Sequence, residues 1–314
     1  MFDLRALPTP IVQAGMGAIA RHELAAAVSE AGGLGTIAGV RAPIATELAA
    51  ARRLTGQPLA VNLLLPFLRS GDAAEAAGAD VIVTFWGRPR RLAAVAWIHQ
   101  CGSVEEAKAA AGEGADAVIA QGVESGGHVR GTVPALELLE RVRAAVDIPV
   151  LVAGGIAERA DVAAALEAGA AGVVVGTRFL MSEESHAHPE YKRRCVDARE
   201  TVLTELFGLS WPDAPHRVIP NAATRRWLTG DARGPAWVRR ANQFSRPLAA
   251  RLPGPLVKRA TDAQRPSQPF LSPQPPTDDG PPSLVESGPL YAGETVSRIA
   301  GVAPAAALVR ELVP

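Results

Sequence analysis

The sequence predicts an α/β protein: a (β/α)8 TIM barrel with a smaller C-terminal cap segment. Short β-branched apolar runs recur eight times before residue 180, and stretches with helical periodicity separate them. Apolar residues make up 48% of the 314 residues but aromatic residues only 4%, which favours an interior of Ala, Val, Ile and Leu. Alternating strands and helices imply parallel pairing, and eight repeats within about 175 residues favour a closed barrel over an open sheet.

The expected strands follow the chain in order. They are residues 10–15, 34–39, 59–65, 81–87, 96–102, 116–122, 149–154 and 172–177. Between the first two, residues 22–31 have helical periodicity and end at Gly32-Gly33, a typical helix C-terminus. The segment 88–95 is shorter than a full crossover helix, so either this βα unit is trimmed or the strand assignment beside it is wrong.

The composition changes after the eighth strand. Residues 189–206 are predicted to form an amphipathic helix, and ten prolines then fall within 253–289. Helical periodicity returns near the end of the chain. We therefore expect a barrel formed by 1–206 and 286–314, and a cap or substrate segment at 207–285 that is partly proline-rich and loosely structured.

Charge and cysteine content exclude several classes of protein. Lys and Arg number 32, as do Asp and Glu, so the chain lacks the basic excess of a nucleic-acid binder. No apolar run reaches the ~18 residues of a membrane span, and the start does not look like a signal peptide, so we expect a cytoplasmic protein. Cys101 and Cys195 cannot form a CxxC zinc site and are expected to be reduced and buried; no metal site is predicted.

In such a barrel, ligands bind where the strands end. After the first strand, Gly15 and Gly17 flank Met16, which would let backbone N–H groups approach a flat ligand; a simple tight turn is the alternative. Asn62 lies within an apolar run, where a carbonyl-rich heterocycle or a structural partner would satisfy its amide.

The segment 121–131 gives the strongest local signal. It starts at Gln121, contains four glycines including Gly126, and projects one imidazole, His128. Such a loop can approach a ligand closely, so His128 is the best candidate base in the chain, although a loop histidine can also be merely solvated. The other histidines lack such a context.

The last two strands end in glycine motifs. Gly154-Gly155 follows the seventh strand, and the eighth runs through Val174 and Val175 to Gly176 and Thr177. Glycines at these two strand ends are what a barrel phosphate site requires, whereas close helix–strand packing would explain one motif more easily than two.

These motifs, taken together, resemble the nitronate monooxygenase family, formerly the 2-nitropropane dioxygenases. The similarity rests on GMG, VN, QGxExGGHxxG, AGGI and GTRFLMSEESHAHPEYK in order over about 8–206, and on the closing segment 288–313. The resemblance implies FMN with its phosphate on Gly155, Gly176 and Thr177, and His128 above the ring. It also implies flavin contacts from the residues Met16 (backbone), Asn62, Gln121, Gly126, and Val174 and Val175 (backbone).

Such enzymes oxidise alkyl nitronates with dioxygen to a carbonyl compound and nitrite. His128 would remove the α-proton of a neutral nitroalkane or, when protonated, hold the anionic nitronate. The sequence departs from the family pattern at Ser125 and Val174. Four aromatic residues are candidates for the substrate pocket or for the core: Phe85, Trp86, Trp97 and Trp211.

Two other functions remain open. A flavin-dependent enoyl-acyl-carrier-protein reductase resembles the chain over the same barrel and would require NAD(P)H. A non-catalytic flavin-binding protein would keep the glycine loops for binding alone, which His128 argues against.

Overall fold

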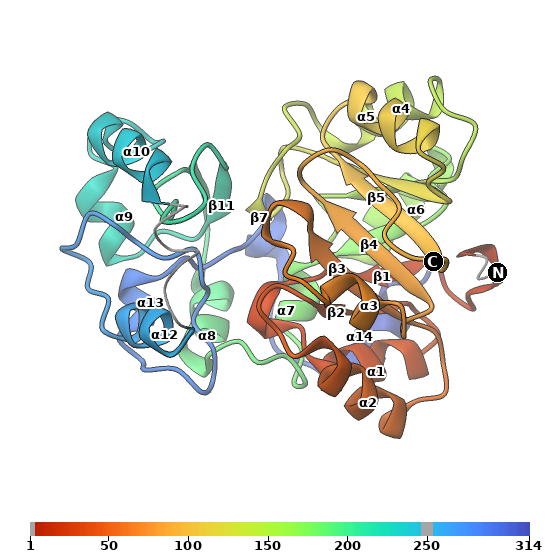
Figure 1. Cartoon of the computed structure of the whole chain (residues 1–314), viewed down its shortest axis with the longest axis horizontal. Helices are drawn as coiled ribbons and strands as arrows, with labels where there is room; N and C mark the ends of the chain where they lie inside the picture. The colour runs from red at the N-terminus through yellow and green to blue at the C-terminus, as the bar shows by residue number, and fades with distance from the viewer. Residues whose placement is uncertain (1–3, 246–253) are drawn as a thin grey trace. The chain divides into compact units, whose positions relative to one another are not determined.

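A computed structural model describes residues 4–245 and 254–314, and the chain divides into two compact units (Figure 1). The barrel unit comprises Met1–Ser125, Arg130–Ser185 and Gly301–Pro314. The second unit comprises Gly126–Val129 and His186–Ala300. The second unit therefore contains 207–245 and 254–285, together with four residues of the His128 loop; residues 246–253 of the predicted cap segment lie outside the described residues.

Eight parallel strands form the sheet of the barrel unit, as predicted. Their order is β1-β9-β8-β6-β5-β4-β3-β2, and a parallel bridge between Val12 and Leu34 links the two outermost strands. The strands are β1 (Ile11–Gln13), β2 (Gly35–Ala38), β3 (Leu59–Leu64), β4 (Val81–Phe85), β5 (Ala96–Cys101), β6 (Ala117–Gln121), β8 (Val150–Ala153) and β9 (Val173–Val175). All eight lie within the expected ranges, so the TIM-barrel prediction is confirmed.

The side chain of Gln13 completes the seam between β1 and β2. The backbone N–H of Gln13 donates to the Leu34 carbonyl at 3.0 Å, and its Oε1 accepts from the Thr36 N–H at 2.9 Å. Gln13 is fully buried. An amide therefore replaces a ladder bond where the two strands pair over a short length only.

Helices separate most of the strands. In the barrel unit they are α1 (His22–Glu30), α2 (Ile44–Leu54), α3 (Asp72–Ala76), α4 (Val104–Gly112), α5 (Ala135–Arg143), α6 (Arg159–Glu167), α7 (Thr177–Leu180) and α14 (Ala305–Leu312), with short 3-10 turns at Leu4–Ala6, Gly17–Ile19 and Leu65–Phe67. Residues 88–95, between β4 and β5, contain no helix, so the first alternative, a trimmed unit, is confirmed. The last helix, α14, packs against α1 and α6.

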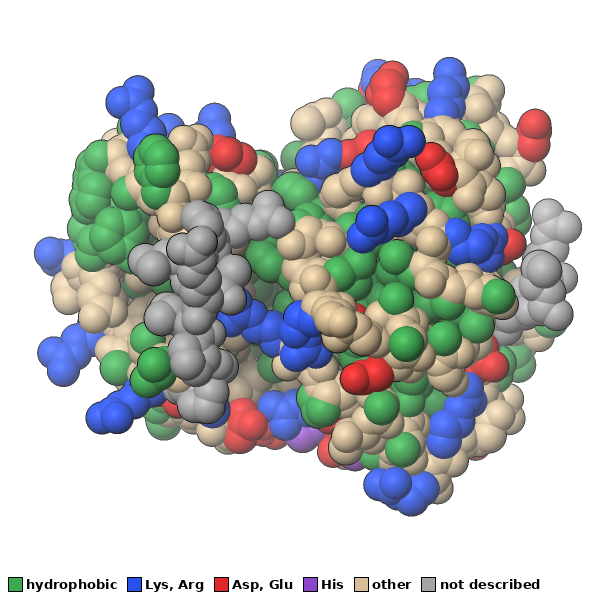
Figure 2. Space-filling view, viewed as in Figure 1, with side chains coloured by type: hydrophobic (Ala, Val, Ile, Leu, Met, Phe, Trp, Pro, Cys, Tyr) green, Lys and Arg blue, Asp and Glu red, His purple; other side chains and the backbone are tan. Residues whose placement is uncertain are grey.

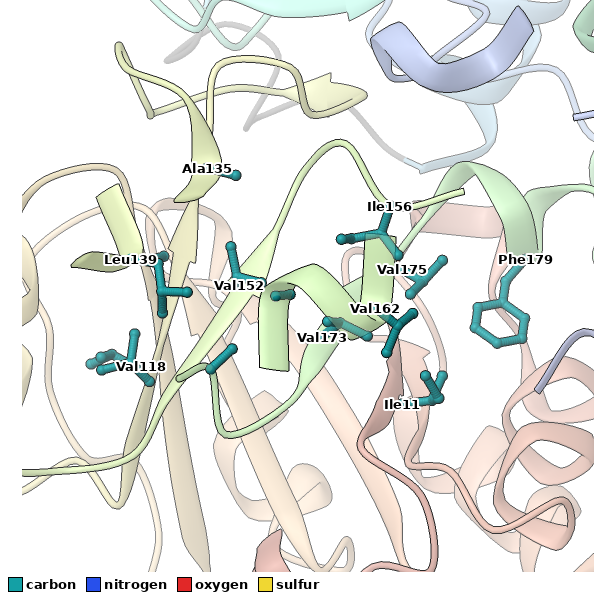
Figure 3. Close-up of a cluster of buried hydrophobic side chains, with 14 of the residues drawn as sticks. Ile11, Val118, Ala135, Leu139, Val152, Ile156, Val162, Val173, Val175 and Phe179 are labelled. Atoms are coloured by element: carbon teal, nitrogen blue, oxygen red, sulfur yellow. The ribbon is translucent and has the colours of Figure 1, made fainter. Parts of the chain in front are cut away.

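Alternating side chains build two apolar layers in the barrel unit. Val12, Val81, Ile98, Ile119 and Leu151 belong to the cluster that fills the barrel. The next residues along the strands face the helices. Figure 3 shows this outer cluster, with Val118 and Val152 near Leu139 of α5, Val173 near Val162 of α6, and Val175 near Phe179 of α7. Small and β-branched residues fill both layers, as the low aromatic content predicts.

The second unit consists of short elements. They are β7 (Gly127–His128), α8 (Pro189–Asp197), β10 (Val202–Thr204), β11 (His216–Val218), α9 (Ala222–Trp227), α10 (Ala236–Gln243), α12 (Gly254–Asp262), α13 (Leu284–Ser287) and a 3-10 helix (Glu294–Arg298). The three strands form an antiparallel sheet in the order β10-β11-β7.

The helix expected over 189–206 was wrong in its second half. Helix α8 ends at Asp197, and Val202 and Thr204 pair instead with Val218 and His216 of β11. Valine and threonine favour strands, and the partner strand satisfies their backbone groups. The error matters because β11 also pairs with the strand that carries His128.

Buried polar side chains tie the proline-rich part of the second unit together. Asn221 Nδ2 donates to the carbonyls of Val285 and Gly288 at 3.0 and 2.8 Å, and its Oδ1 accepts from the Thr224 N–H. Gln264 Oε1 accepts from the Ser272 N–H at 2.7 Å. Side-chain amides thus satisfy backbone groups that no regular ladder pairs.

None of the helices within 4–245 and 254–314 combines the length and apolar character that crossing a membrane requires.

Candidate active site

The predicted site residues are divided between the two units. Eight lie in the barrel unit, at or just after the carboxyl ends of strands: Met16, Asn62, Gln121, Gly155, Val174, Val175, Gly176 and Thr177. Gly126 and His128 belong to the second unit. We call the first group, with its neighbouring loops, the barrel mouth.

Close backbone contacts bring three strand ends of the barrel mouth together. A Cβ atom at Gly15 would lie 2.5 Å from Asn62 Cβ, so the loop after β1 passes directly over the Asn62 side chain of β3. A Cβ at Gly176 would lie 3.8 Å from Ala14 Cβ, which brings the end of β9 beside β1. Asn62 is buried, and its Nδ2 lies 3.4 Å from the Val83 carbonyl. Residues expected to contact one ligand are therefore neighbours.

Gly176 differs from the glycines that packing requires. A Cβ at Gly131 would lie 2.0 Å from the Gln121 carbonyl oxygen, so only glycine fits there. At Gly176 the nearest described atom is at ordinary contact distance, and its φ of −104° is open to any residue. Neither packing nor a positive φ therefore requires glycine at position 176.

Arg130 anchors the exit of the His128 loop to the barrel unit. Its backbone N–H donates to Gln121 Oε1 at 2.9 Å, which fixes the orientation of that amide. Its guanidinium forms an ion pair with Glu106 and lies 4.8 Å from the centre of the Trp86 ring. A Cβ at Gly102 would lie 2.4 Å from the Arg130 carbonyl carbon, so the backbone at Arg130 lies against the end of β5.

His128 lies in a cluster of aromatic rings within the second unit, which we call the imidazole cluster. Its ring stacks on Trp211 with centroids 3.7 Å apart and an interplanar angle of 17°, and the rings of His216 and Tyr291 lie 5.1 and 5.4 Å away. Burial, and secondarily His216, lowers the pKa of His128 well below its usual value. The imidazole is therefore neutral at neutral pH, the form that accepts a proton.

His216 supports this cluster but cannot exchange protons readily. Its Nε2 accepts from the Phe207 N–H at 3.2 Å, so the proton resides on Nδ1 and is donated to the Ala214 carbonyl at 2.9 Å. Burial lowers the pKa of His216 to about 4. The sequence did not indicate His216, because its proximity to His128 arises from the pairing of β11 with β7.

The aromatic candidates for the substrate pocket have different surroundings. Phe85 and Trp86 are buried at the end of β4. Trp97 is buried in the outer cluster, and its Nε1 donates to Thr84 Oγ1 at 2.7 Å. Trp211 covers His128. The loop that carries Trp211 places Ser210 and Asp213 at positive φ, a conformation that costs energy for these residues.

The chain was compared with known families and proteins. The pattern of the nitronate monooxygenase family matches residues 1–87 and 87–252. A relative from Mycobacterium tuberculosis is a (3aS,4S,5R,7aS)-5-hydroxy-7a-methyl-1-oxo-octahydro-1H-indene-4-carboxyl-CoA dehydrogenase; it is 36% identical over 78% of this chain and 73% of its own length. A probable nitronate monooxygenase from Staphylococcus saprophyticus is 32% identical over 63% of this chain and 73% of its own length.

Two solved structures resemble the chain over nearly its full length. FabK from Thermotoga maritima aligns over 99% of this chain and 93% of its own, with 29% identity and a TM-score of 0.76. Nitroalkane oxidase from Streptomyces ansochromogenes aligns over 98% of this chain and 96% of its own, with 30% identity and a TM-score of 0.76.

Proposed function

The chain belongs to the nitronate monooxygenase family, and we propose that it oxidises alkyl nitronates with dioxygen, using FMN, to a carbonyl compound and nitrite. Family membership supports a flavin-dependent oxidoreductase. A probable nitronate monooxygenase among its relatives and a nitroalkane oxidase among similar structures support the substrate class.

The barrel mouth fits FMN. We assign the phosphate to the backbone of Gly155, Gly176 and Thr177, because Gly176 leaves room that protein atoms do not fill. The flavin contacts proposed for the remaining residues come from Met16 and Val174–Val175 through the backbone, from the Asn62 and Gln121 amides, and from Gly126. When bound, FMN supplies the electron acceptor and the reaction with dioxygen.

The position of His128 on the glycine-rich loop, with its ring stacked on Trp211 at a centroid distance of 3.7 Å, is the observation that carries the proposed chemistry. The partly buried imidazole of His128, whose pKa is lowered, has an unprotonated ring nitrogen at neutral pH. It can accept the α-proton of a neutral nitroalkane and convert it to the nitronate, the more easily oxidised form. Stacking on Trp211 fixes the plane of the ring, so the direction of proton transfer is fixed as well.

Replacing His128 by alanine tests this role. His128→Ala should still bind FMN but lose about 10²–10⁴-fold in kcat/KM on a neutral nitroalkane, with a smaller loss on the pre-formed nitronate. His186→Ala, which removes an imidazole elsewhere in the second unit, is the control. Equal losses on both substrates would assign His128 to holding the anion, and no loss on either would exclude it from the mechanism.

A second candidate function is dehydrogenation of an acyl-CoA thioester, favoured by the higher identity of the mycobacterial relative. Anaerobic mixing separates the candidates, because the compound that bleaches the flavin identifies the electron donor. Bleaching by a nitronate supports the first function, and bleaching by a CoA thioester supports the second. Rapid stoichiometric bleaching by NADH would indicate the enoyl reductase instead, and no bleaching by any of them would indicate a binding protein.

A further inference from the structure

Although the net charge of the whole chain is zero, one segment of the second unit is strongly basic. Between residues 217 and 265 the sequence contains eleven Lys and Arg but only two acidic residues, Asp231 and Asp262. Several of the exposed large apolar side chains lie in or just after this segment: Trp237, Phe244, Leu256 and Phe270. Positive charge and exposed apolar surface therefore occur together.

Three aromatic rings form a row on this surface. Trp227 of α9 and Trp237 of α10 have centroids 6.2 Å apart, and Trp237 and Phe270 are also 6.2 Å apart, both pairs edge to face. Trp227 is fixed by a hydrogen bond from its Nε1 to the Pro266 carbonyl at 2.9 Å. Trp237, the central ring, is 54% exposed. Figure 2 shows apolar side chains gathered over α9 and α10, with basic side chains around them.

Three exposed arginines contact this row or lie close to it in sequence, and they have no acidic partner among residues 4–245 and 254–314. Arg226 lies 5.6 Å from the centre of the Trp227 ring, Arg240 follows Trp237 by one helical turn, and Arg265 precedes Pro266. Their neighbours are paired: Arg233 with Glu205, Arg239 with Asp231 and Lys258 with Asp262. We call the three rings and three unpaired arginines the aromatic–arginine patch.

We propose that the aromatic–arginine patch binds the adenosine 3′,5′-bisphosphate end of a CoA thioester substrate. A half-exposed indole offers a face on which adenine can stack, and planar guanidinium groups bind phosphate through paired hydrogen bonds. CoA carries both an adenine ring and several phosphates, so one ligand uses both kinds of side chain. The inference rests on the second candidate function and specifies how that substrate is held.

Calorimetric titration of the whole protein with adenosine 3′,5′-bisphosphate tests the patch without any turnover. Binding should weaken as salt increases, and Trp237→Ala should weaken it about tenfold, the order of one base–aromatic stack. The double variant Arg226→Gln/Arg240→Gln should weaken binding and reduce its salt dependence. Trp237→Phe should retain most of the affinity, and Arg53→Gln, which removes an exposed charge from α2 of the barrel unit, should have no effect.

Three results would overturn the proposal. The first is that the wild-type chain does not bind adenosine 3′,5′-bisphosphate, and the second is that Trp237→Ala and the double arginine variant bind it as tightly as the wild type. The third is that Trp237→Ala differs from the wild type in molecular mass by sedimentation, which would mean that a second copy of the chain covers the patch. Binding is measured without flavin reduction, so the patch as a CoA-binding site and the acyl-CoA dehydrogenase function are tested independently. A CoA thioester that bleaches the flavin without binding to the patch contradicts the patch alone, and patch binding without bleaching contradicts the second candidate function alone.

Discussion

Inside the barrel unit, most of the groups that join distant segments are Val, Ile, Leu and Ala side chains stacked in two layers, with single amides such as Gln13 between strands. In the second unit, a small apolar cluster is supplemented by hydrogen bonds between backbone groups and single side chains: Asn221 donates to the Val285 carbonyl, whereas Gln264 and His216 accept from backbone N–H groups. Apolar layers follow a periodic pattern, whereas single amides do not. The difference shows why one unit can be predicted from its sequence and the other cannot, and it leads to five tests.

The largest effect is expected at Gly176, where the barrel mouth is proposed to bind phosphate. Gly176→Asp should weaken FMN binding by at least about 100-fold, because a carboxylate would occupy the phosphate position and repel its charge. The visible spectrum of the purified variant measures flavin content. Gly112→Asp, which adds a carboxylate where no atom lies within 4 Å of the new Cβ, should keep its flavin. Wild-type flavin content in Gly176→Asp would place the phosphate elsewhere.

Asn221→Leu tests the polar framework of the second unit. The change keeps an approximate volume but leaves the carbonyls of Val285 and Gly288 and the N–H of Thr224 without their partner, so we expect a loss of about 3 kcal/mol in unfolding free energy. Hydrogen exchange should rise in second-unit peptides first. Ile119→Val, in the filled barrel, should cost about 1 kcal/mol and leave those peptides protected. If both variants lost hydrogen-exchange protection equally in the two units, the proposed difference between the polar framework of the second unit and the apolar layers of the barrel would be wrong.

Each unit holds one buried imidazole whose pKa is lowered to about 4, His99 in the barrel unit and His216 in the second. The unfolded chain binds these protons near pH 6.5 and the folded chain does not, so stability is complete above pH 6.5 and falls toward pH 4. We expect about 2 kcal/mol lost per imidazole at pH 5. Urea unfolding as a function of pH measures the slope, which His99→Gln and His216→Gln should each reduce. If neither variant changed the slope of unfolding free energy against pH, His99 and His216 would not be the source of the pH dependence.

Arg130 tests the junction between the barrel unit and the His128 loop. Arg130→Ala removes the ion pair with Glu106 and the contact with Trp86, so hydrogen exchange in 122–133 should rise and nitroalkane turnover should fall about tenfold. Arg130→Lys keeps the charge and should recover part of the exchange protection and part of the nitroalkane turnover. Turnover that falls without any change in exchange would mean that Arg130 acts on the substrate directly.

The smallest effect is expected at the two thiols. Burial raises the pKa of Cys101 and of Cys195 to about 12, and neither forms a disulfide. Both should therefore resist a thiol reagent in the native protein and react after denaturation, as counted by mass spectrometry. Rapid native labelling of Cys195 alone would show that the second unit opens more readily than the barrel.

The comparison also explains what the sequence could predict. Periodic apolar runs located all eight barrel strands. The glycines after those runs predict a ligand site at the barrel mouth, which stays a prediction. The strands β10 and β11 have three residues each, too few for a periodic signal, so residues 202–204 were assigned to a helix. His216 became significant only through its pairing opposite His128, a contact between residues that are distant in sequence. Local pattern cannot indicate such a partner.

The β7 strand has a consequence for exchanging parts between relatives. Gly127 and His128 pair with Arg217 and His216, although Ser125 and Arg130 on either side belong to the barrel unit. A chimera that replaced only residues 186–300 would keep the imidazole of one parent and receive the facing strand of the other. A functional graft must therefore include residues 126–129, and the natural module boundary runs through the middle of the glycine loop.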